Sequence, residues 1–191
     1  MTYGIDVSEN NGHVDWQAVA DAGQKFAIVR SSYGRYSKDE DFLRNVDGAH
    51  SAGLKCGAYH YSYALTPEQA RQEARRCKDV IDRAGVLLEL PVFFDMEDAD
   101  GYKSRHGFDF SRENVTAICK AFLEEIKPLD CGVYASLSWL EDRIDWQGLG
   151  CAVWNAQWGK QDDLQGYMWQ YTDQLNIGGK TFDGNVLYLD L

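Results

Sequence analysis

The sequence predicts an α/β protein whose sheet closes into an irregular TIM-like barrel, with about five βα units followed by three helix-poor strands. Apolar strand-like runs alternate with helical stripes over the first two-thirds of the chain, which is typical of a parallel sheet with right-handed crossovers. In the last third, strand-like segments follow one another closely. The chain has 191 residues, fewer than the about 250 of a complete eight-fold barrel. We expect a single domain over residues 1–191.

Brief apolar runs mark the strands, as expected where both faces of a sheet are covered. The first five are YGIDVS (3–8), KFAIVRSSYG (25–34), LKCGAYHYSYA (54–64), PVFFDME (91–97) and CGVYAS (131–136). The closing three are CAVWNAQW (151–158), GYMWQYT (166–172) and GNVLYLDL (184–191). Short connections between the closing segments favour antiparallel pairing for some of them.

Helical stripes lie between the early strands. From Pro67 to Gly85 apolar residues recur at helical spacing, with proline suited to the first turn and glycine to the end. Ser111 is a good N-cap for a second stripe, which contains Val115, Ile118, Phe122 and Ile126. Gly23 and Gly53 are expected to end two earlier helices. We expect the stretch ADGYKSRHGFDFS (99–111) to be a long loop.

Polar and aromatic residues stand where the predicted strands end. In a βα barrel the carboxyl ends of the parallel strands meet on one face, and that face carries the site. The residues at or just after these ends are Asp6, Ser31, Tyr33, His60, Tyr61, Tyr63, Asp95, Glu97, Tyr134, Trp154, Asn155, Trp169 and Gln170, with Asp183 in the approach to the last strand. They are rich in acids, aromatics and amides and poor in cations, which argues against a phosphate ligand.

Asp95 and Glu97 are the strongest candidates for chemistry. They follow the apolar residues Val92 to Phe94, and residues two apart in a strand point to the same side, so Met96 points the other way. Converging acids raise the pKa of at least one of them, and a carboxyl group that stays protonated near neutral pH can act as a general acid. Asp98 and Asp100 fit solvated loop charges or helix caps better.

The aromatic residues at the strand ends favour a carbohydrate ligand. Sugar rings have apolar C–H faces that stack on Trp and Tyr, while amides and carboxylates hydrogen-bond to the hydroxyl groups. A pocket around the paired acids would draw on Tyr61, Tyr134, Trp154, Asn155 and Gln170.

Composition excludes several classes of function. The formal charge of −11 argues against binding nucleic acid through phosphates. No apolar run is long enough for a membrane span, and the start MTYGIDVSENNG lacks the regions of a signal peptide. That start is consistent with cytoplasmic synthesis and release, or with a trimmed secreted domain. The widely spaced cysteines, without a C-x-x-C, favour reduced thiols over disulfides or a zinc site: Cys56, Cys77, Cys119, Cys131 and Cys151.

Five motifs in order resemble those of the Chalaropsis-type lysozymes, glycoside hydrolase family 25, which include phage endolysins and bacterial muramidases. GIDVSENNGHVDW resembles the opening strand with Asp6 as its acid, and FFDMED resembles the D-x-E strand. VWNAQW resembles the W-x-A-x-aromatic segment, although Asn155 stands where an aliphatic residue is expected. MWQYT resembles the W-Q-Y segment, and FDGNVLYLDL, which contains Asp183 and Asp190, resembles the closing segment.

The resemblance implies a single catalytic domain that cleaves the β-1,4 bond from N-acetylmuramic acid to N-acetylglucosamine in bacterial peptidoglycan. It implies Glu97 as general acid and base, Asp95 as its partner, and Asp6 and Asp183 as supporting acids. It also implies retention of anomeric configuration, either through the substrate's 2-acetamido group or through direct attack by Asp95. We expect a monomer without metal or cofactor that acts on the bacterial cell wall. Whether a separate wall-binding module follows Leu191 is left open.

Two alternatives remain on the residues alone. One is a metal-dependent barrel hydrolase with Asp6, His60, Asp95, Glu97 and Asp183 as ligands, although His60 is the one histidine expected near the mouth and suits a core position better. The other is a non-catalytic barrel that binds wall glycan, against which the intact D-x-E, Asp6 and Asp183 argue.

Overall fold

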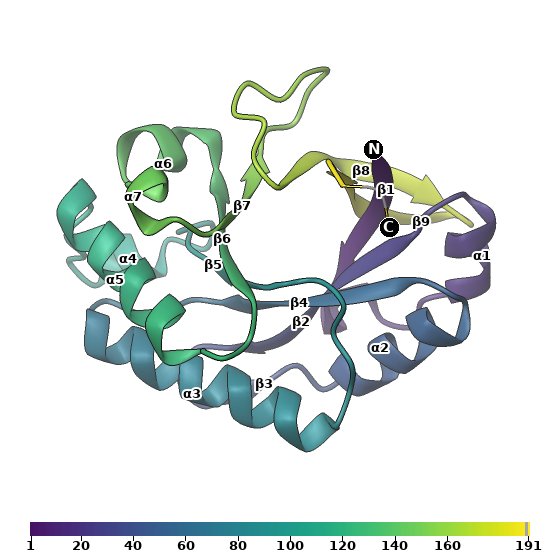
Figure 1. Ribbon diagram of the computed structural model, residues 1–191, viewed down its shortest axis with the longest axis horizontal. Helices are drawn as coiled ribbons and strands as arrows, with labels where there is room; N and C mark the ends of the chain where they lie inside the picture. Colours follow the sequence, from purple (N-terminus) through teal and green to yellow (C-terminus); the bar gives the residue numbers. More distant parts are fainter. Residues whose placement is uncertain (190) are drawn as a thin grey trace.

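Eight strands close into a barrel in the computed structural model, which describes residues 1–189 and 191 (Figure 1). The strand order is β1-β9-β8-β7-β6-β5-β4-β2, and pairing of β1 with β2 closes the ring. The strands are β1 (Thr2–Val7), β2 (Phe26–Tyr33), β4 (Lys55–Tyr61), β5 (Val92–Asp95), β6 (Cys131–Ser136), β7 (Ala152–Ala156), β8 (Met168–Ile177) and β9 (Lys180–Leu187), with the two-residue β3 (Ser37–Lys38) beside β2. The predicted barrel is confirmed. Asp190 of the closing motif lies outside the described residues.

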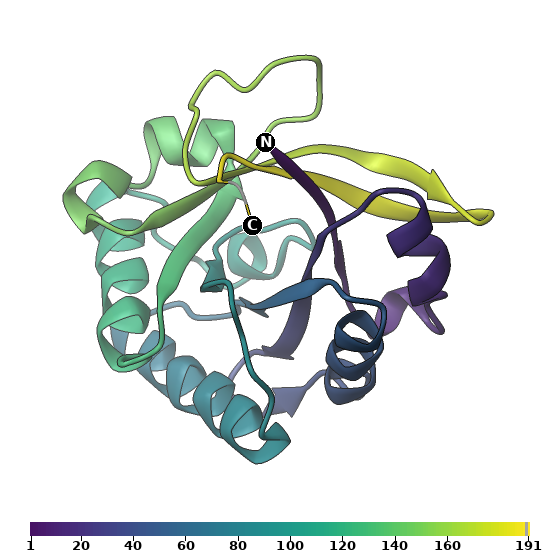
Figure 2. The same cartoon turned by 45° about the vertical axis from the view of Figure 1, so that its right-hand side comes forward.

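The closing strand β9 breaks the parallel pattern. It is antiparallel to both β8 and β1, whereas every other pair around the barrel is parallel. Gly178 and Gly179, with φ of 59° and 82°, make the two-residue turn between β8 and β9, and positive φ at both positions suits a hairpin turn. The resulting β8–β9 ribbon extends beyond the ring (Figure 2). Asp183 therefore lies inside β9 and not in the approach to it.

Helices lie around most of the outside of the barrel and leave the β8 side open (Figure 1). The predicted helices are present as α3 (Pro67–Ala84) and α5 (Arg112–Glu125), while α1 (Trp16–Asp21) and α2 (Phe42–Ser51) end just before Gly23 and Gly53. The structure adds η1 (Glu9–Asn11), α6 (Leu137–Asp142) and α7 (Trp146–Leu149). A one-turn helix, α4 (Tyr102–Arg105), stands where a long loop was expected. The sequence did not reveal it because a helix this short leaves no periodic pattern. Among the described residues, no helix has the length and apolarity to cross a membrane.

The core has two layers because side chains alternate along each strand. Outward-facing residues such as Ile5, Val29 and Phe94 pack beneath the helices in the larger cluster. Inward-facing residues fill the barrel and include Phe26, Phe93 and Trp154. The interior is packed, so any ligand must bind at its mouth.

A close contact inside the barrel lies at Gly132 on β6. A Cβ added there would collide with the Ala152 carbonyl oxygen and lie 2.8 Å from Phe93 Cε1. We expect Gly132→Ala to lower the free energy of unfolding by about 1–3 kcal/mol, because overpacking forces the backbone or the ring to move. Thermal unfolding measures this loss. Gly159→Ala is the matched control, since nothing lies within 4 Å of an added Cβ there, and equal unfolding temperatures for the two variants would contradict this packing.

Candidate active site

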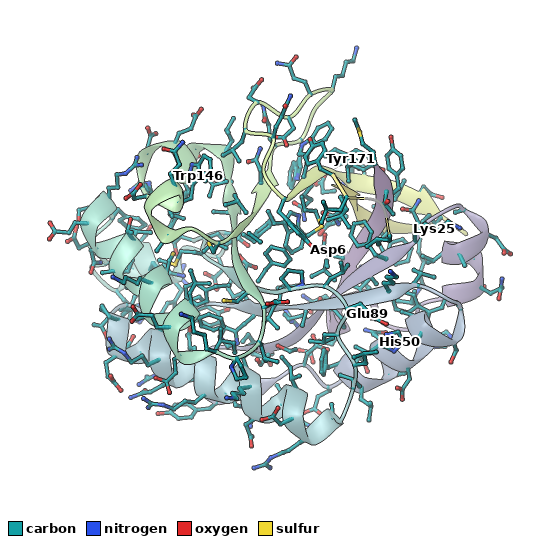
Figure 3. All side chains as sticks on the ribbon, in the orientation of Figure 1. Asp6, Lys25, His50, Glu89, Trp146 and Tyr171 are labelled. Carbon is teal, nitrogen blue, oxygen red and sulfur yellow. The ribbon has the colours of Figure 1, made fainter. Side chains whose placement is uncertain are left out.

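A cavity of about 290 Å³ opens at the carboxyl ends of the parallel strands. Thirteen residues line it: Asp6, Ser8, Asn10, Asn11, Arg30, Tyr59, Tyr61, Asp95, Glu97, Tyr134, Trp154, Gln170 and Asp183. Eight of the nine residues predicted from the sequence are among them, and Asn155 is the exception. Figure 3 shows Asp6 inside the ring of strands. The cavity brings together residues from across the whole chain.

Strand register sets which side chains enter the cavity. Tyr61, Asp95, Tyr134 and Trp154 are successive cross-strand partners on β4 to β7, so they stand at one level of the barrel. Met96 is fully buried in the outer layer, while Glu97 returns to the cavity beside Asp95. The period-2 argument for these residues therefore holds in the structure. Tyr59 lies two residues before Tyr61 on β4, so the same alternation would have identified it as a cavity residue.

Asp95 and Glu97 form the first acid pair, in which the charge of Glu97 acts on Asp95. Asp95 is 4% exposed, and its Oδ1 has no hydrogen-bond partner among the described residues. Burial, and then the charge of Glu97, raise the pKa of Asp95 well above its usual range. Burial also raises the pKa of Glu97, which is the more exposed of the two. The pair can therefore hold one proton at a pH where isolated carboxyls are ionised.

Asp6 and Asp183 form the second acid pair, as direct partners on antiparallel β1 and β9. Asp6 Oδ2 accepts hydrogen bonds from Gln170 Nε2 at 3.0 Å and Asn185 Nδ2 at 2.8 Å. Burial is the largest cause that raises the pKa of each acid, and the charge of Asp183 adds to the rise at Asp6. The second pair therefore has its own amide donors, and its raised pKa values favour protonation of one of the two carboxyls.

The aromatic and amide residues of the cavity are held by bonds to one another. Gln170 Oε1 accepts hydrogen bonds from the Tyr134 hydroxyl at 3.0 Å and from Trp158 Nε1 at 3.1 Å. Trp154 is 1% exposed and donates from Nε1 to Asn185 Oδ1 at 2.8 Å. Gln170 and Trp154 thus form the floor of the cavity and orient its other groups, whereas Tyr61 and Glu97 are more exposed to it.

Asn155 lies outside the cavity, which corrects its predicted place among the ligand-contacting residues. It follows Trp154 on β7 and therefore faces the opposite side of the strand. Its Nδ2 donates to Asp162 Oδ1 at 2.7 Å. Asp162 also accepts hydrogen bonds from Leu164 N and the Tyr188 hydroxyl. Asn155 therefore anchors the loop between β7 and β8.

Lys103 is a buried cation that the sequence did not reveal. It belongs to α4, is 1% exposed, and donates from Nζ to the backbone oxygens of Ser62 at 2.5 Å and Glu97 at 2.7 Å. Its charge lowers the pKa values of Asp95 and Glu97 and so opposes the effect of burial. Among the carboxylates around Lys103, the fully buried Glu73 of α3 does most to favour its charge. No local pattern in a short polar stretch signals such a contact.

His60 is a core residue and faces away from the cavity. It is fully buried, with Nδ1 2.8 Å from Ser32 Oγ and Nε2 3.5 Å from Glu73 Oε2. Among the residues that the structure describes, no three His, Cys, Asp or Glu side chains are grouped to hold a metal ion. The five metal ligands considered from the sequence therefore do not face one site, because His60 points out of the barrel while the four acids point into the cavity.

Asp98 and Asp100 serve as caps, as the sequence favoured. Asp98 accepts hydrogen bonds from Lys103 N and from Ser104 N and Oγ, and Asp100 accepts from Tyr102 N. Both carboxylates therefore hold the first turn of α4, where free backbone N–H groups need acceptors.

Comparisons with known sequences match this chain to glycosidases. The family model of the glycosyl hydrolases family 25 matches residues 5–180. The autolytic lysozyme of Clostridium acetobutylicum is 27% identical over 179 residues, which cover 92% of this chain and 52% of that protein. Lysozyme M1 of Streptomyces globisporus is 27% identical over 195 residues, which cover 94% of this chain and 65% of that protein. The chain thus spans only about half to two-thirds of these relatives.

The fold is shared with solved structures. The modular autolysin LytC of Streptococcus pneumoniae, in complex with a synthetic peptidoglycan ligand, has a TM-score of 0.88 and 23% identity to this chain. The match covers 98% of this chain and 46% of that one. At this identity the likeness supports the irregular barrel and not a particular ligand.

Lys103→Met should destabilise the protein strongly. It leaves the backbone oxygens of Ser62 and Glu97 without their Nζ donor, and a buried acceptor that loses its partner costs about 1–3 kcal/mol. Urea unfolding followed by circular dichroism measures the change in the free energy of unfolding. Lys120→Met is the control, because the Lys120 side chain is 66% exposed and 3.9 Å from Glu124, and its loss should stay within about 0.5 kcal/mol. Similar small losses for both variants would show that Lys103 carries no structural charge.

Proposed function

This chain belongs to the glycosyl hydrolases family 25, and from that premise we propose that it hydrolyses the glycan strands of bacterial peptidoglycan. The observation that carries the proposal is the meeting of two pairs of carboxyl groups in one aromatic-lined cavity at the barrel mouth. Most glycoside hydrolysis uses one protonated and one ionised carboxyl beside the bond, and the raised pKa values of Asp95 and Glu97 support such a division of roles. The names of the curated relatives, which are lysozymes, support the same substrate.

We assign the cleaved bond to the β-1,4 linkage from N-acetylmuramic acid to N-acetylglucosamine, which makes the enzyme a 1,4-β-N-acetylmuramidase. Residues 1–191 would act as one catalytic domain on the glycan strand of the cell wall. The sugar rings would stack on Tyr61 and Tyr134 above the floor of Trp154 and Gln170. This orientation would bring the glycosidic oxygen to Glu97.

Glu97 is the proposed general acid and base. It is the more exposed member of the first acid pair, so it can reach the leaving oxygen, while nearly buried Asp95 holds the shared proton in place. Glu97 gives its proton to the glycosidic oxygen as the C1–O bond breaks. Its carboxylate later takes a proton from the water that attacks C1, and anomeric configuration is retained.

The substrate's 2-acetamido oxygen is the proposed nucleophile, and Asp95 would orient and stabilise that group. The burial of Asp95 favours this role over direct attack on C1. Asp6 and Asp183 would keep negative charge near the developing positive charge at C1. Gln170 and Asn185 would hold Asp6 in position for this purpose.

Glu97→Gln should lower kcat/KM by about 10²–10⁴, the usual contribution of a general acid. Glutamine keeps the shape of the side chain but carries no transferable proton, so circular dichroism should show an intact fold. Release of reducing ends from purified peptidoglycan measures the rate, and mass spectrometry of the products should find muramic acid at the reducing end. A folded variant with more than about a tenth of the activity would contradict the role of Glu97. Chelator added to the unmodified protein is the control, and inhibition by it would favour a metal-dependent hydrolase.

The rate of hydrolysis should show a bell-shaped dependence on pH. Activity should fall at high pH when the first acid pair loses its shared proton, and at low pH when the pair gains a second one. Because burial raises the pKa values of both acids, the alkaline limb should lie above the ordinary glutamate value of 4.5. Asp183→Asn should move that limb to lower pH, because the charge of Asp183 helps to raise the pKa of Glu97. Initial rates on purified glycan measure both profiles, and a flat profile between about pH 4 and 8 would rule out control by such a pair.

A further inference from the structure

Two partly exposed cysteines, Cys131 and Cys151, meet at the end of the barrel that lies opposite the acid cavity. Cys131 is the first residue of β6, and Cys151 immediately precedes β7. These strands are parallel, and their register pairs Gly132 with Ala152, so the two cysteines stand side by side one residue before that pair. They are 20 residues apart in the chain, and the pairing of β6 with β7 brings them together.

Both thiols face the outer layer of the core. Val133 and Val153, the cross-strand pair two residues further on, lie in that layer. Because side chains alternate along a strand, Cys131 and Cys151 point to the same side, and both pack against this layer. Neighbouring strands lie about 4.7–4.9 Å apart, and a disulfide needs Cα atoms about 4.4–6.8 Å apart. A bond between the two sulfurs therefore fits the sheet.

A cavity of about 270 Å³ between α5 and α7 gives solvent access to this pair, because both cysteines line it. The other three cysteines, which are Cys56, Cys77 and Cys119, are fully buried, and all five carry free thiols. A small molecule in the cavity can therefore reach Cys131 and Cys151 in the folded protein while the other three thiols stay protected.

Cys131 is the better nucleophile of the pair. Its thiol donates a hydrogen bond to the backbone oxygen of Leu123 at 3.7 Å. Burial raises the pKa of both thiols, and the pKa of Cys151 rises to about 11. At Cys131 the charge of Lys127 lowers the pKa and opposes the effect of burial. Because the thiolate is the attacking form, Cys131 should react first, and faster at alkaline pH.

We propose that Cys131 and Cys151 are a modification site, at which a small organic disulfide oxidises the two thiols to one intramolecular disulfide. The Cys131 thiolate attacks one sulfur of the oxidant and expels the other half of the oxidant as a thiolate. The Cys151 thiolate then attacks the Cys131 sulfur of this mixed disulfide and expels the second half. In all, the two protein thiols lose two electrons and two protons, and the oxidant becomes two thiols.

The bond would fasten the start of β6 to the start of β7 and close the segment that carries α6 and α7. A crosslink that closes a loop of about 20 residues restricts the unfolded chain and so favours the folded state. The bond lies away from the acids, which stand at the carboxyl ends of the parallel strands. It should therefore stabilise the barrel and leave the rate of hydrolysis unchanged.

Cys119 is the competing partner for Cys151, because the charge of Cys151 acts on it. It lies within α5 and is fully buried, and burial raises its pKa well above the usual range. It therefore supplies little thiolate for the second attack. Cys131, by contrast, stands directly beside Cys151 in the sheet and lines the same cavity.

The first test identifies the bond. Folded protein is treated with oxidised glutathione at alkaline pH, the remaining thiols are alkylated after unfolding, and unreduced peptides are analysed by mass spectrometry. The peptides that contain Cys131 and Cys151 should be joined, with the other three cysteines alkylated. Cys151→Ser protein should retain glutathione on Cys131, whereas Cys119→Ala protein should form the bond. Thiols that stay free, glutathione adducts without a crosslink, or a bond from Cys151 to Cys119 would overturn the proposal.

The second test measures what the bond does. The oxidised protein should unfold at a temperature about 5–10 °C above that of the reduced protein, and dithiothreitol should abolish the difference. Cys131→Ser protein is the matched control and should show no rise after the same oxidation. Release of reducing ends from purified peptidoglycan should be the same for both forms of the unmodified protein. Equal unfolding temperatures of the crosslinked and reduced forms, or a loss of activity on crosslinking, would overturn the stabilising role.

Discussion

Four carboxyl groups share a cavity of about 290 Å³, and keeping them there is the constraint on which the rest of the site depends. An isolated carboxylate taken out of water costs several kcal/mol unless it is paired or neutralised. Burial and the pairing of acid with acid raise the pKa values of all four carboxyls, which favours their neutral forms and lowers this cost. The protein adds amide donors at Asp6 and a cation behind Glu97. The raised pKa values that result are what a general acid needs near neutral pH.

The irregular closure of the barrel brings two of these four acids together. Because β9 runs antiparallel to β1, Asp183 stands directly opposite Asp6. The same strand presents Asn185, which bonds to both Asp6 and Trp154. The tight hairpin from β8 makes this possible with few residues, and this is how a chain shorter than a regular eight-fold barrel still completes the ring.

The segment from Glu97 to Arg105 holds the proposed general acid in place. Asp98 and Asp100 anchor α4, and Lys103 fixes α4 to the Glu97 backbone. A strand-end loop that is held in this way keeps its side chains at defined positions, which is needed where a small displacement of a catalytic group costs much of the rate.

The sequence by itself determined the elements and the residues whose signals are local. Alternation placed Asp95 and Glu97 on one side of a strand, and Pro67 and Gly85 marked the ends of α3. The position of Asp183 within β9, the outward orientation of Asn155 toward Asp162, and the contact of Lys103 with Glu97 were decided only by the tertiary structure. Each of these depends on which strands or loops meet, and such pairings leave no periodic mark on the sequence because the partners are brought together by the closure of the barrel.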